Sequence, residues 1–148
     1  MSGLAIFLVA LMIGSSQACR CIFQPLGQKY CDSKFAILAN VTQVQEPSIS
    51  NDYIWTYTLE VGAIFRDEGI GAITLGNGAT VKSYSDSCRV ILQQGHTYIL
   101  AGGRQGLGDL WLHECSAIFF DITSSSPQEE IVSLVLSVPE PCPYLTSP

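Results

Sequence analysis

The residues of this chain with the clearest capacity for chemistry are its six cysteines. They are Cys19, Cys21, Cys31, Cys88, Cys115 and Cys142. Cysteines either pair as disulfides or bind metals as thiolates, and a structural zinc site usually needs two close pairs with CxxC-type spacing. This sequence has one close pair, Cys19 and Cys21, so the even count favours disulfides. The pattern leaves the pairing open, except that a bond between Cys19 and Cys21 would close a strained, very small ring.

The two histidines do not indicate an enzyme. His96 and His113 are the only histidines that could assist cysteines at a metal site or act as general bases. No serine near them has the spacing of a nucleophile elbow. A secreted hydrolase would need a nucleophile or general-base constellation that the sequence does not contain, so no catalytic residues are expected.

Residues 1–18 have the pattern of a secretory signal peptide. Leu4 to Ile13 form an apolar run, and Ser16 and Ala18 place small residues at the −3 and −1 positions before Cys19. A membrane anchor is disfavoured because the run is short for a bilayer, and a lipoprotein cysteine is disfavoured because of Ser16. Cleavage after Ala18 would make Cys19 the first residue of a secreted protein, in a compartment where disulfides form.

The charge balance restricts the partners. The formal net charge is −6, which argues against binding to nucleic acids or to anionic membrane surfaces. No other apolar run is long enough to span a bilayer. We expect one extracellular, monomeric domain over residues 19–142, followed by a short tail at 143–148.

Five stretches have the composition and alternation of β-strands. Apolar, β-branched and aromatic residues alternate with polar ones in the first two, and clusters of glycine separate the later ones. The expected strands are 35–42, 53–61, 79–84, 97–101 and 110–114. Five strands with glycine-rich turns favour a mainly β fold, a small closed antiparallel barrel of the Greek-key, oligonucleotide/oligosaccharide-binding type. Periodicity alone does not separate this barrel from a small sandwich.

A helix is expected near the end of the sequence. Ser126, Pro127 and Glu129 fit an N-cap, a first-turn proline and a capping-box glutamate. Apolar residues then recur at helical spacing until Pro139, at Ile131, Leu134, Val135 and Val138. This helix should pack its apolar stripe on the barrel.

Asn40, Val41 and Thr42 form an N-glycosylation sequon. Asn40 lies on the polar side of the alternation in the first expected strand. We therefore expect Asn40 to be exposed and to carry a glycan in the secreted protein.

The cysteine pattern resembles that of a known family. Cys19-Arg20-Cys21 at the expected new N-terminus, with the spacing of the four later cysteines, is similar to the N-terminal, netrin-like domain of the tissue inhibitors of metalloproteinases. The stretches from Cys31 to Ala39 and from Tyr98 to Gly102 also resemble strands of that domain. The second half of the full-length inhibitors, with its own cysteines, has no counterpart in this sequence.

The resemblance implies a bonding pattern and a mode of inhibition. The implied disulfides are Cys19–Cys88, Cys21–Cys115 and Cys31–Cys142. The free amine and carbonyl of Cys19 would bind the catalytic zinc of a target metalloproteinase. The inhibitor would have no cofactor of its own, because the zinc is supplied by the protease.

The resemblance also implies a contact surface around Cys19. It consists of Cys19, Arg20, Cys21, Ile22, Phe23, Ser85, Asp86 and Ser87. Arg20 would enter the protease S1′ pocket, where the family usually has a small hydroxyl residue, and burial of an unpaired guanidinium is costly. The alternative function is a non-inhibitory netrin-like binding module in matrix, signalling or innate defence, for which the Cys19 amine would be irrelevant.

Overall fold

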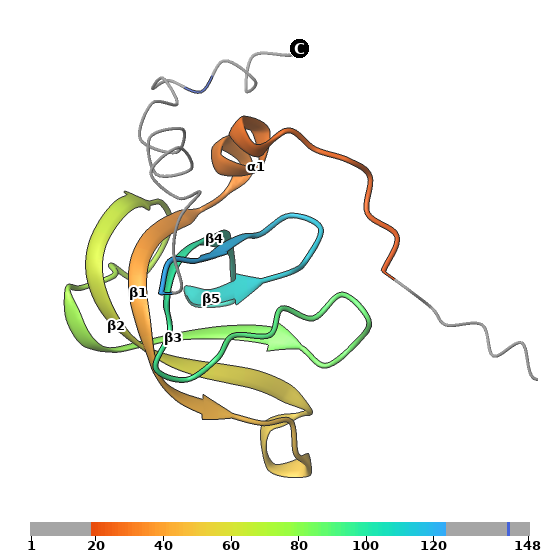
Figure 1. Ribbon diagram of the computed structural model, residues 1–148, viewed down its shortest axis with the longest axis vertical. Helices are drawn as coiled ribbons and strands as arrows, with labels where there is room; N and C mark the ends of the chain where they lie inside the picture. Colours follow the sequence, from red (N-terminus) through yellow and green to blue (C-terminus); the bar gives the residue numbers. More distant parts are fainter. Residues whose placement is uncertain (1–18, 124–141, 143–148) are drawn as a thin grey trace, which may run out of the picture.

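The computed structural model describes residues 19–123 and Cys142 (Figure 1). The elements are α1 (Leu26–Asp32), β1 (Phe35–Gln45), the 3-10 helix η1 (Ile49–Asn51), β2 (Ile54–Asp67), β3 (Gly76–Tyr84), β4 (Thr97–Gln105), β5 (Asp109–Leu112) and β6 (Ile118–Asp121). The expected signal peptide, the expected helix between Ser126 and Pro139 and the expected tail at 143–148 lie outside the described residues.

The five expected strands close into a barrel. β1 pairs antiparallel with β2 and with β4, β2 pairs with β3, β3 runs parallel to β5, and β5 returns to β4. The second edge of β4 is shared, since residues 98–101 pair with β6 and residues 103–105 pair with β5. The mainly β, closed five-stranded barrel is therefore confirmed, and its assignment to the Greek-key type stays a prediction. The expectation of an antiparallel barrel is wrong at one place, because β3 and β5 pair in parallel.

The interior of the barrel follows the alternation seen in the sequence. In β2, Tyr57, Leu59 and Val61 are buried, and each lies one residue away from a side chain that is more exposed. The register between β1 and β2 shifts at three places, and such irregularities let long strands bend around a small core. The main core combines residues from every barrel strand, including Phe35, Ile37, Val41, Tyr57, Leu59, Val81, Leu100 and Leu112.

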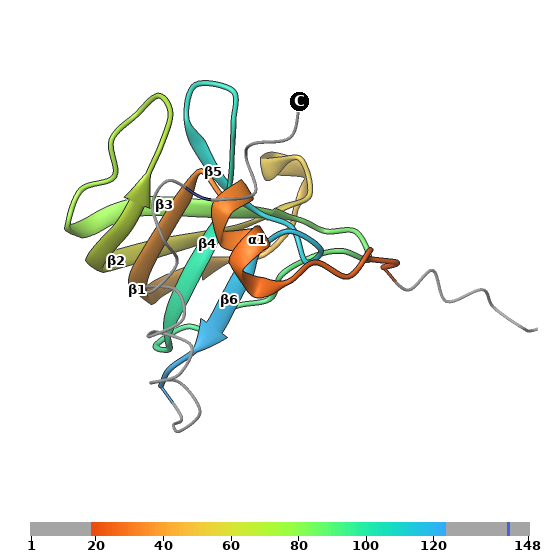
Figure 2. The same ribbon diagram turned by 90° about the horizontal axis from the view of Figure 1, so that it is seen from above.

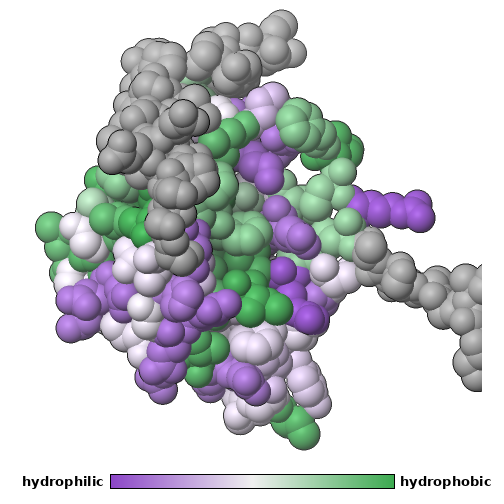
Figure 3. Space-filling model, in the orientation of Figure 1, coloured by the Kyte–Doolittle hydropathy of each residue, from purple (hydrophilic) through white to green (hydrophobic). Residues whose placement is uncertain are grey.

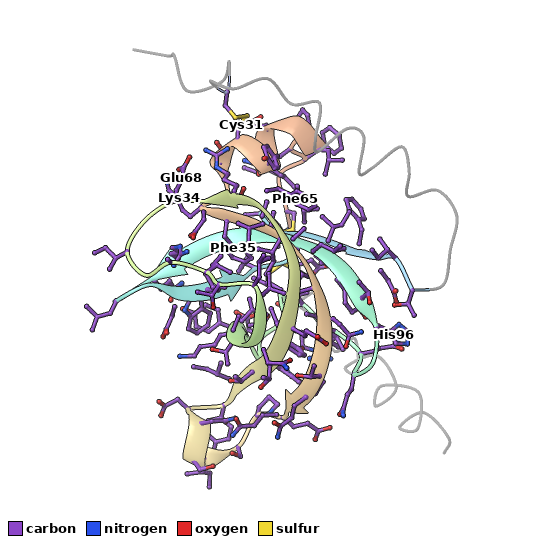
Figure 4. The ribbon with its side chains drawn as sticks, turned by 90° about the vertical axis from the view of Figure 1, so that its left-hand side faces the viewer. Cys31, Lys34, Phe35, Phe65, Glu68 and His96 are labelled. Carbon is purple, nitrogen blue, oxygen red and sulfur yellow. A yellow bond between two sulfur atoms is a disulfide. The ribbon has the colours of Figure 1, made fainter. Side chains whose placement is uncertain are left out.

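A second apolar cluster lies between α1 and the outside of the barrel. Tyr30 and Cys31 of α1 pack there against Ala36, Ala101 and Ile118. Figure 4 shows Cys31 on α1, outside the barrel, and Phe35 within it. This arrangement explains why β4 is buried on both faces from Tyr98 to Gly102.

Most strand bounds differ by a few residues from the expected ones, and three differences are larger. β2 continues to Asp67 instead of ending near residue 61, because the bulges carry the pairing past Gly62. β6 was not expected, and its short sequence Ile118–Asp121 has no clear alternation. The helix α1 was not expected either, because it contains Gly27 and spans only seven residues.

The buried Tyr57 should make stability sensitive to alkaline pH. Burial raises the pKa of Tyr57 to about 12, and its hydroxyl donates a 2.8 Å hydrogen bond to the Val90 carbonyl. Tyrosine in an unfolded polypeptide ionises at about pH 10, so this stabilisation is complete below about pH 10 and is lost as the pH rises towards 12. Tyr98, whose pKa burial also raises, contributes in the same direction.

We expect Tyr57→Phe to lower the free energy of unfolding by about 1–2 kcal/mol at neutral pH, because the Val90 carbonyl loses its buried donor. We also expect the variant to lose less stability than the wild type between neutral and alkaline pH. Urea denaturation at a series of pH values measures both quantities. An alkaline decline of equal size in the two proteins would contradict the assignment to Tyr57.

The expectation that Asn40 is exposed is wrong. Asn40 is half-buried in β1, opposite Glu60 of β2 and Thr97 of β4. Its Nδ2 donates hydrogen bonds to the Gly95 carbonyl at 3.3 Å and to Thr97 Oγ1 at 3.1 Å. Because β1 is paired along both edges here, a polar side chain on its outer face is flanked by neighbouring strands.

Attachment of a glycan to Asn40 stays a prediction. A glycan would replace one of the two hydrogens of Nδ2, so we expect it to be added before β1 and β4 pair. The intact mass of protein from a eukaryotic secretory host should then fall on glycosidase treatment. An unchanged mass would show that the sequon is unused.

Candidate functional site

The segment from Cys19 to Pro25 runs outside the barrel without regular structure and leads into α1. Two disulfides attach it to the body of the protein. Cys19 is bonded to Cys88 with a Cα–Cα distance of 5.0 Å, and Cys21 to Cys115 with a Cα–Cα distance of 5.0 Å. A third disulfide joins Cys31 of α1 to Cys142. These are the three pairs that the family resemblance implied.

The parallel pairing of β3 and β5 brings the two anchoring loops together. Val81 to Ser83 pair with Leu110 to Leu112 in the same direction, so both strands end at the same edge of the barrel. The loop after β3 reaches Cys88, and the loop after β5 reaches Cys115. Figures 1 and 2 both show these loops beside the N-terminal segment, at the right of the molecule.

Hydrogen bonds join the two loops directly. The carbonyl of Cys88 accepts a 3.0 Å hydrogen bond from the backbone N–H of Glu114. Asp86 Oδ1 accepts from the N–H of Cys88 at 2.9 Å, and His113 Nδ1 accepts from the N–H of Cys115 at 3.3 Å. The backbones of Cys88 and Cys115 are therefore each held by a hydrogen bond within their own loop, in addition to the disulfide.

The loop after Cys88 is also tied to the barrel core. The buried N–H of Val90 donates to Ser83 Oγ at 2.9 Å, and the Val90 carbonyl accepts from Tyr57. Further along, the N–H of Gln93 donates to the Tyr98 hydroxyl at 3.0 Å. The disulfide at Cys88 therefore connects the N-terminal segment to a well-anchored part of the fold.

The sulfur atoms of the two anchoring disulfides lie close together. Cys19 Sγ is 3.4 Å from Cys115 Sγ and 3.8 Å from Cys21 Sγ. Among the described residues, these three cysteines form the one cluster close enough to resemble a metal site. All three are in disulfides and are therefore not thiolate ligands.

The expected contact residues lie at this edge of the molecule, and most of them are exposed. Ile22 and Phe23 are each 89% exposed, while Cys19 is half-buried. Arg20 and the three residues before Cys88, which are Ser85, Asp86 and Ser87, are also exposed. Figure 3 shows apolar and polar surface side by side along the N-terminal segment. Ile22 and Phe23 are adjacent in sequence, so these two apolar side chains are available to a partner.

The two histidines have structural contacts. His96 Nδ1 lies 2.6 Å from Asp121 Oδ2 and thereby connects the start of β4 to the end of β6 (Figure 4). This hydrogen bond holds the pKa of Asp121 below its usual value. His113 shapes the turn that contains Cys115, since its carbonyl accepts the N–H groups of Ser116 and Ala117 at 3.0 and 2.7 Å.

The sequence did not reveal the turn from His113 to Ala117 as a support for the site. Its role depends on β6, which brings the backbone back to β4 directly after the turn. The contact between Glu114 and Cys88 joins residues far apart in sequence, and no local pattern marks it. The sequence also does not show that β3 and β5 are parallel, which is what places the two anchoring loops side by side.

One of two comparisons with known proteins found a match. No curated protein matches the sequence. Within the part of the protein that the structure describes, none of the helices has the length and apolar character needed to cross a membrane. The family model described as tissue inhibitor of metalloproteinase matches residues 17–133, which is most of the sequence and includes both anchoring disulfides. The chain belongs to the tissue inhibitor of metalloproteinase family.

Proposed function

We propose that this protein is a secreted inhibitor of zinc metalloproteinases that blocks the catalytic zinc with the α-amino nitrogen and carbonyl oxygen of Cys19. The observation that carries the proposal is the anchoring of Cys19 and Cys21 to two adjacent loops, with Ile22 and Phe23 exposed beside them. Membership of the inhibitor family supports the general activity. The role of the Cys19 amine requires removal of residues 1–18.

The chemistry of a catalytic zinc explains why an N-terminus is suited to this task. Such a zinc has three protein ligands and an open position that holds a water, which becomes the nucleophile. A terminal amine and the carbonyl of the same residue can form a five-membered chelate at that position. An internal residue cannot do so, because its nitrogen is an amide without a basic lone pair. Binding to the metal favours the deprotonated amine.

The disulfides reduce the entropic cost of presenting this terminus. A free terminus would have to be ordered when the complex forms. Here Cys19 and Cys21 are fixed to loops that are hydrogen-bonded to each other and to the core. Much of the ordering is therefore already present in the unbound inhibitor.

Arg20 sets the expected specificity. It is exposed and lies between the two anchored cysteines, at the position implied to enter the S1′ pocket. An apolar pocket would bury the guanidinium without a partner, which costs several kcal/mol in general. We therefore expect the preferred targets to have a carboxylate or open solvent in this pocket.

A non-inhibitory netrin-like binding module is the second candidate. Arg20 favours it, because a charge at this position disfavours insertion into apolar protease pockets. This function would use the surface around Ile22 and Phe23 but not the amine of Cys19. Changes confined to that amine therefore separate the two functions.

We expect Arg20→Thr to tighten binding to matrix-type metalloproteinases whose S1′ pockets are apolar. The inhibition constant against a panel of zinc proteases measures the effect. Lys34→Thr is a matched control, because Lys34 is an exposed cation outside the expected contact residues, and among the described residues it forms an ion pair with Glu68 at 3.5 Å (Figure 4). Equal or weaker inhibition by the threonine variant at position 20 across the panel would contradict the assigned role of Arg20.

Inhibition should require Cys19 as the first residue with an unmodified amine. An alanine added before Cys19 converts the amine to an amide and leaves the disulfides and the barrel unchanged. Loss of a bidentate metal contact at the centre of an interface should cost several kcal/mol, or about a thousandfold in affinity. Inhibition assays with the mature and the alanine-extended proteins measure this loss.

Correct folding of the extended protein is checked by its disulfide map and its melting temperature. If the folded, extended protein inhibits as well as the mature form, chelation by Cys19 is wrong. If neither protein inhibits any member of the panel, the binding-module function takes its place.

A further inference from the structure

The three asparagines of the protein differ sharply in their surroundings. Asn40 Nδ2 donates two hydrogen bonds, and the side chain of Asn51 accepts from the N–H of Ser48 at 2.7 Å and donates to the Glu46 carbonyl at 3.0 Å. Asn77 is exposed, and within residues 19–123 its side-chain amide has no hydrogen-bond partner. Asn77 is also the only one of the three that precedes a glycine.

The backbone around Asn77 is loosely paired. Asn77 lies opposite Glu60 and Ala79 lies opposite Leu59, so Gly78 has no partner residue on β2. Gly76 and Gly78 have φ values of 92° and 110°. β5 pairs with β3 only from Val81 to Ser83, which leaves the other edge at Asn77 without a strand among the described residues. A β-bulge at the start of a strand with one free edge opens at low cost.

We propose that Asn77 is a site of spontaneous deamidation in the folded protein. The backbone nitrogen of Gly78 attacks Cγ of Asn77, a new C–N bond forms, and the bond from Cγ to Nδ2 of Asn77 breaks. The departing amide nitrogen takes up the proton from the Gly78 nitrogen and leaves as ammonia. Water then opens the five-membered succinimide at either carbonyl and gives an aspartyl or an isoaspartyl residue.

Glycine at position 78 favours this attack for a steric reason. It has no Cβ to obstruct approach of its nitrogen to Cγ, and apart from Gly78 and its two chain neighbours no described atom lies within 4 Å of where a Cβ would be. The space beside the Gly78 Cα is therefore open. Valine after Asn40 and aspartate after Asn51 lack this freedom.

The product changes the pairing of β2 with β3. Either product places a new carboxylate directly opposite Glu60, and like charges directly opposite each other on neighbouring strands are destabilising. The isoaspartyl product also adds a carbon to the backbone. The start of β3 lies at the left of Figures 1 and 2, at the end of the barrel away from the N-terminal segment. The reaction should therefore lower stability and leave the surface around Cys19 unchanged.

The test is a timed incubation of the full folded protein at neutral and mildly alkaline pH. Peptide mapping by mass spectrometry follows the amides of Asn77, Asn40 and Asn51, and isoelectric focusing follows the gain of negative charge. We expect conversion at Asn77 alone, with separate aspartyl and isoaspartyl peptides. Asn77→Gln should abolish the acidic shift, because the longer glutamine side chain does not form the five-membered ring. The control variant Asn51→Gln should deamidate at Asn77 at the wild-type rate.

Two results would overturn the proposal. The first is an intact Asn77 amide in the folded protein under conditions that convert the same asparagine in the reduced, unfolded protein. The second is conversion of Asn40 or Asn51 as fast as Asn77, which would show that the reaction follows global unfolding. The charge effect is checked separately, since Asn77→Asp should melt at a lower temperature than Asn77→Gln.

Discussion

The covalent attachment of one short segment to two loops is the constraint on which the rest of this molecule depends. Cys19–Cys88 and Cys21–Cys115 close loops of 69 and 94 residues. In the chain-entropy model each such bond stabilises the fold by about 4 kcal/mol. Their larger effect is on geometry, because they hold a terminal segment that has no strand or helix of its own.

This attachment works only because the barrel closes in a particular order. Parallel β3 and β5 direct their following loops to one edge, and β4 carries β5 and β6 in succession along its second edge. The hydrogen bond from Glu114 to the Cys88 carbonyl then fixes the spacing of the two anchoring loops. On the opposite side of β4, α1 and the Cys31–Cys142 disulfide cover a second apolar cluster. The order of the strands and the contacts between the loops therefore determine the position of Cys19.

The sequence was most informative where a signal is local. Alternation located the first two barrel strands and the inward faces of Tyr57, Leu59 and Val61, since period two follows directly from strand geometry. Clusters of glycine separated the three later strands. The cysteine pattern led to the family and, through it, to the disulfide pairs. Local signals failed for β6 and α1, which are short and are stabilised by contacts with β4 and with the second cluster.

The residues of the candidate site could be proposed from the sequence, but their arrangement could not. Arg20, Ile22 and Phe23 follow from their position beside the expected terminus, and they are exposed. The supports provided by Ser83, His113 and Glu114 join residues distant in sequence and become visible only in the folded protein. Asn40 was misjudged for the same reason, because alternation identifies an outward face but not the strands that flank it on both edges.

In the proposed function, the terminal amine of Cys19 replaces water at a partner's zinc. The most direct measurement uses a target metalloproteinase in which cobalt(II) replaces zinc, because the visible absorption of cobalt(II) responds to its ligands. Titration with the mature protein should change this spectrum in step with inhibition and should saturate at equimolar inhibitor. Full inhibition with an unchanged cobalt spectrum would contradict coordination by Cys19.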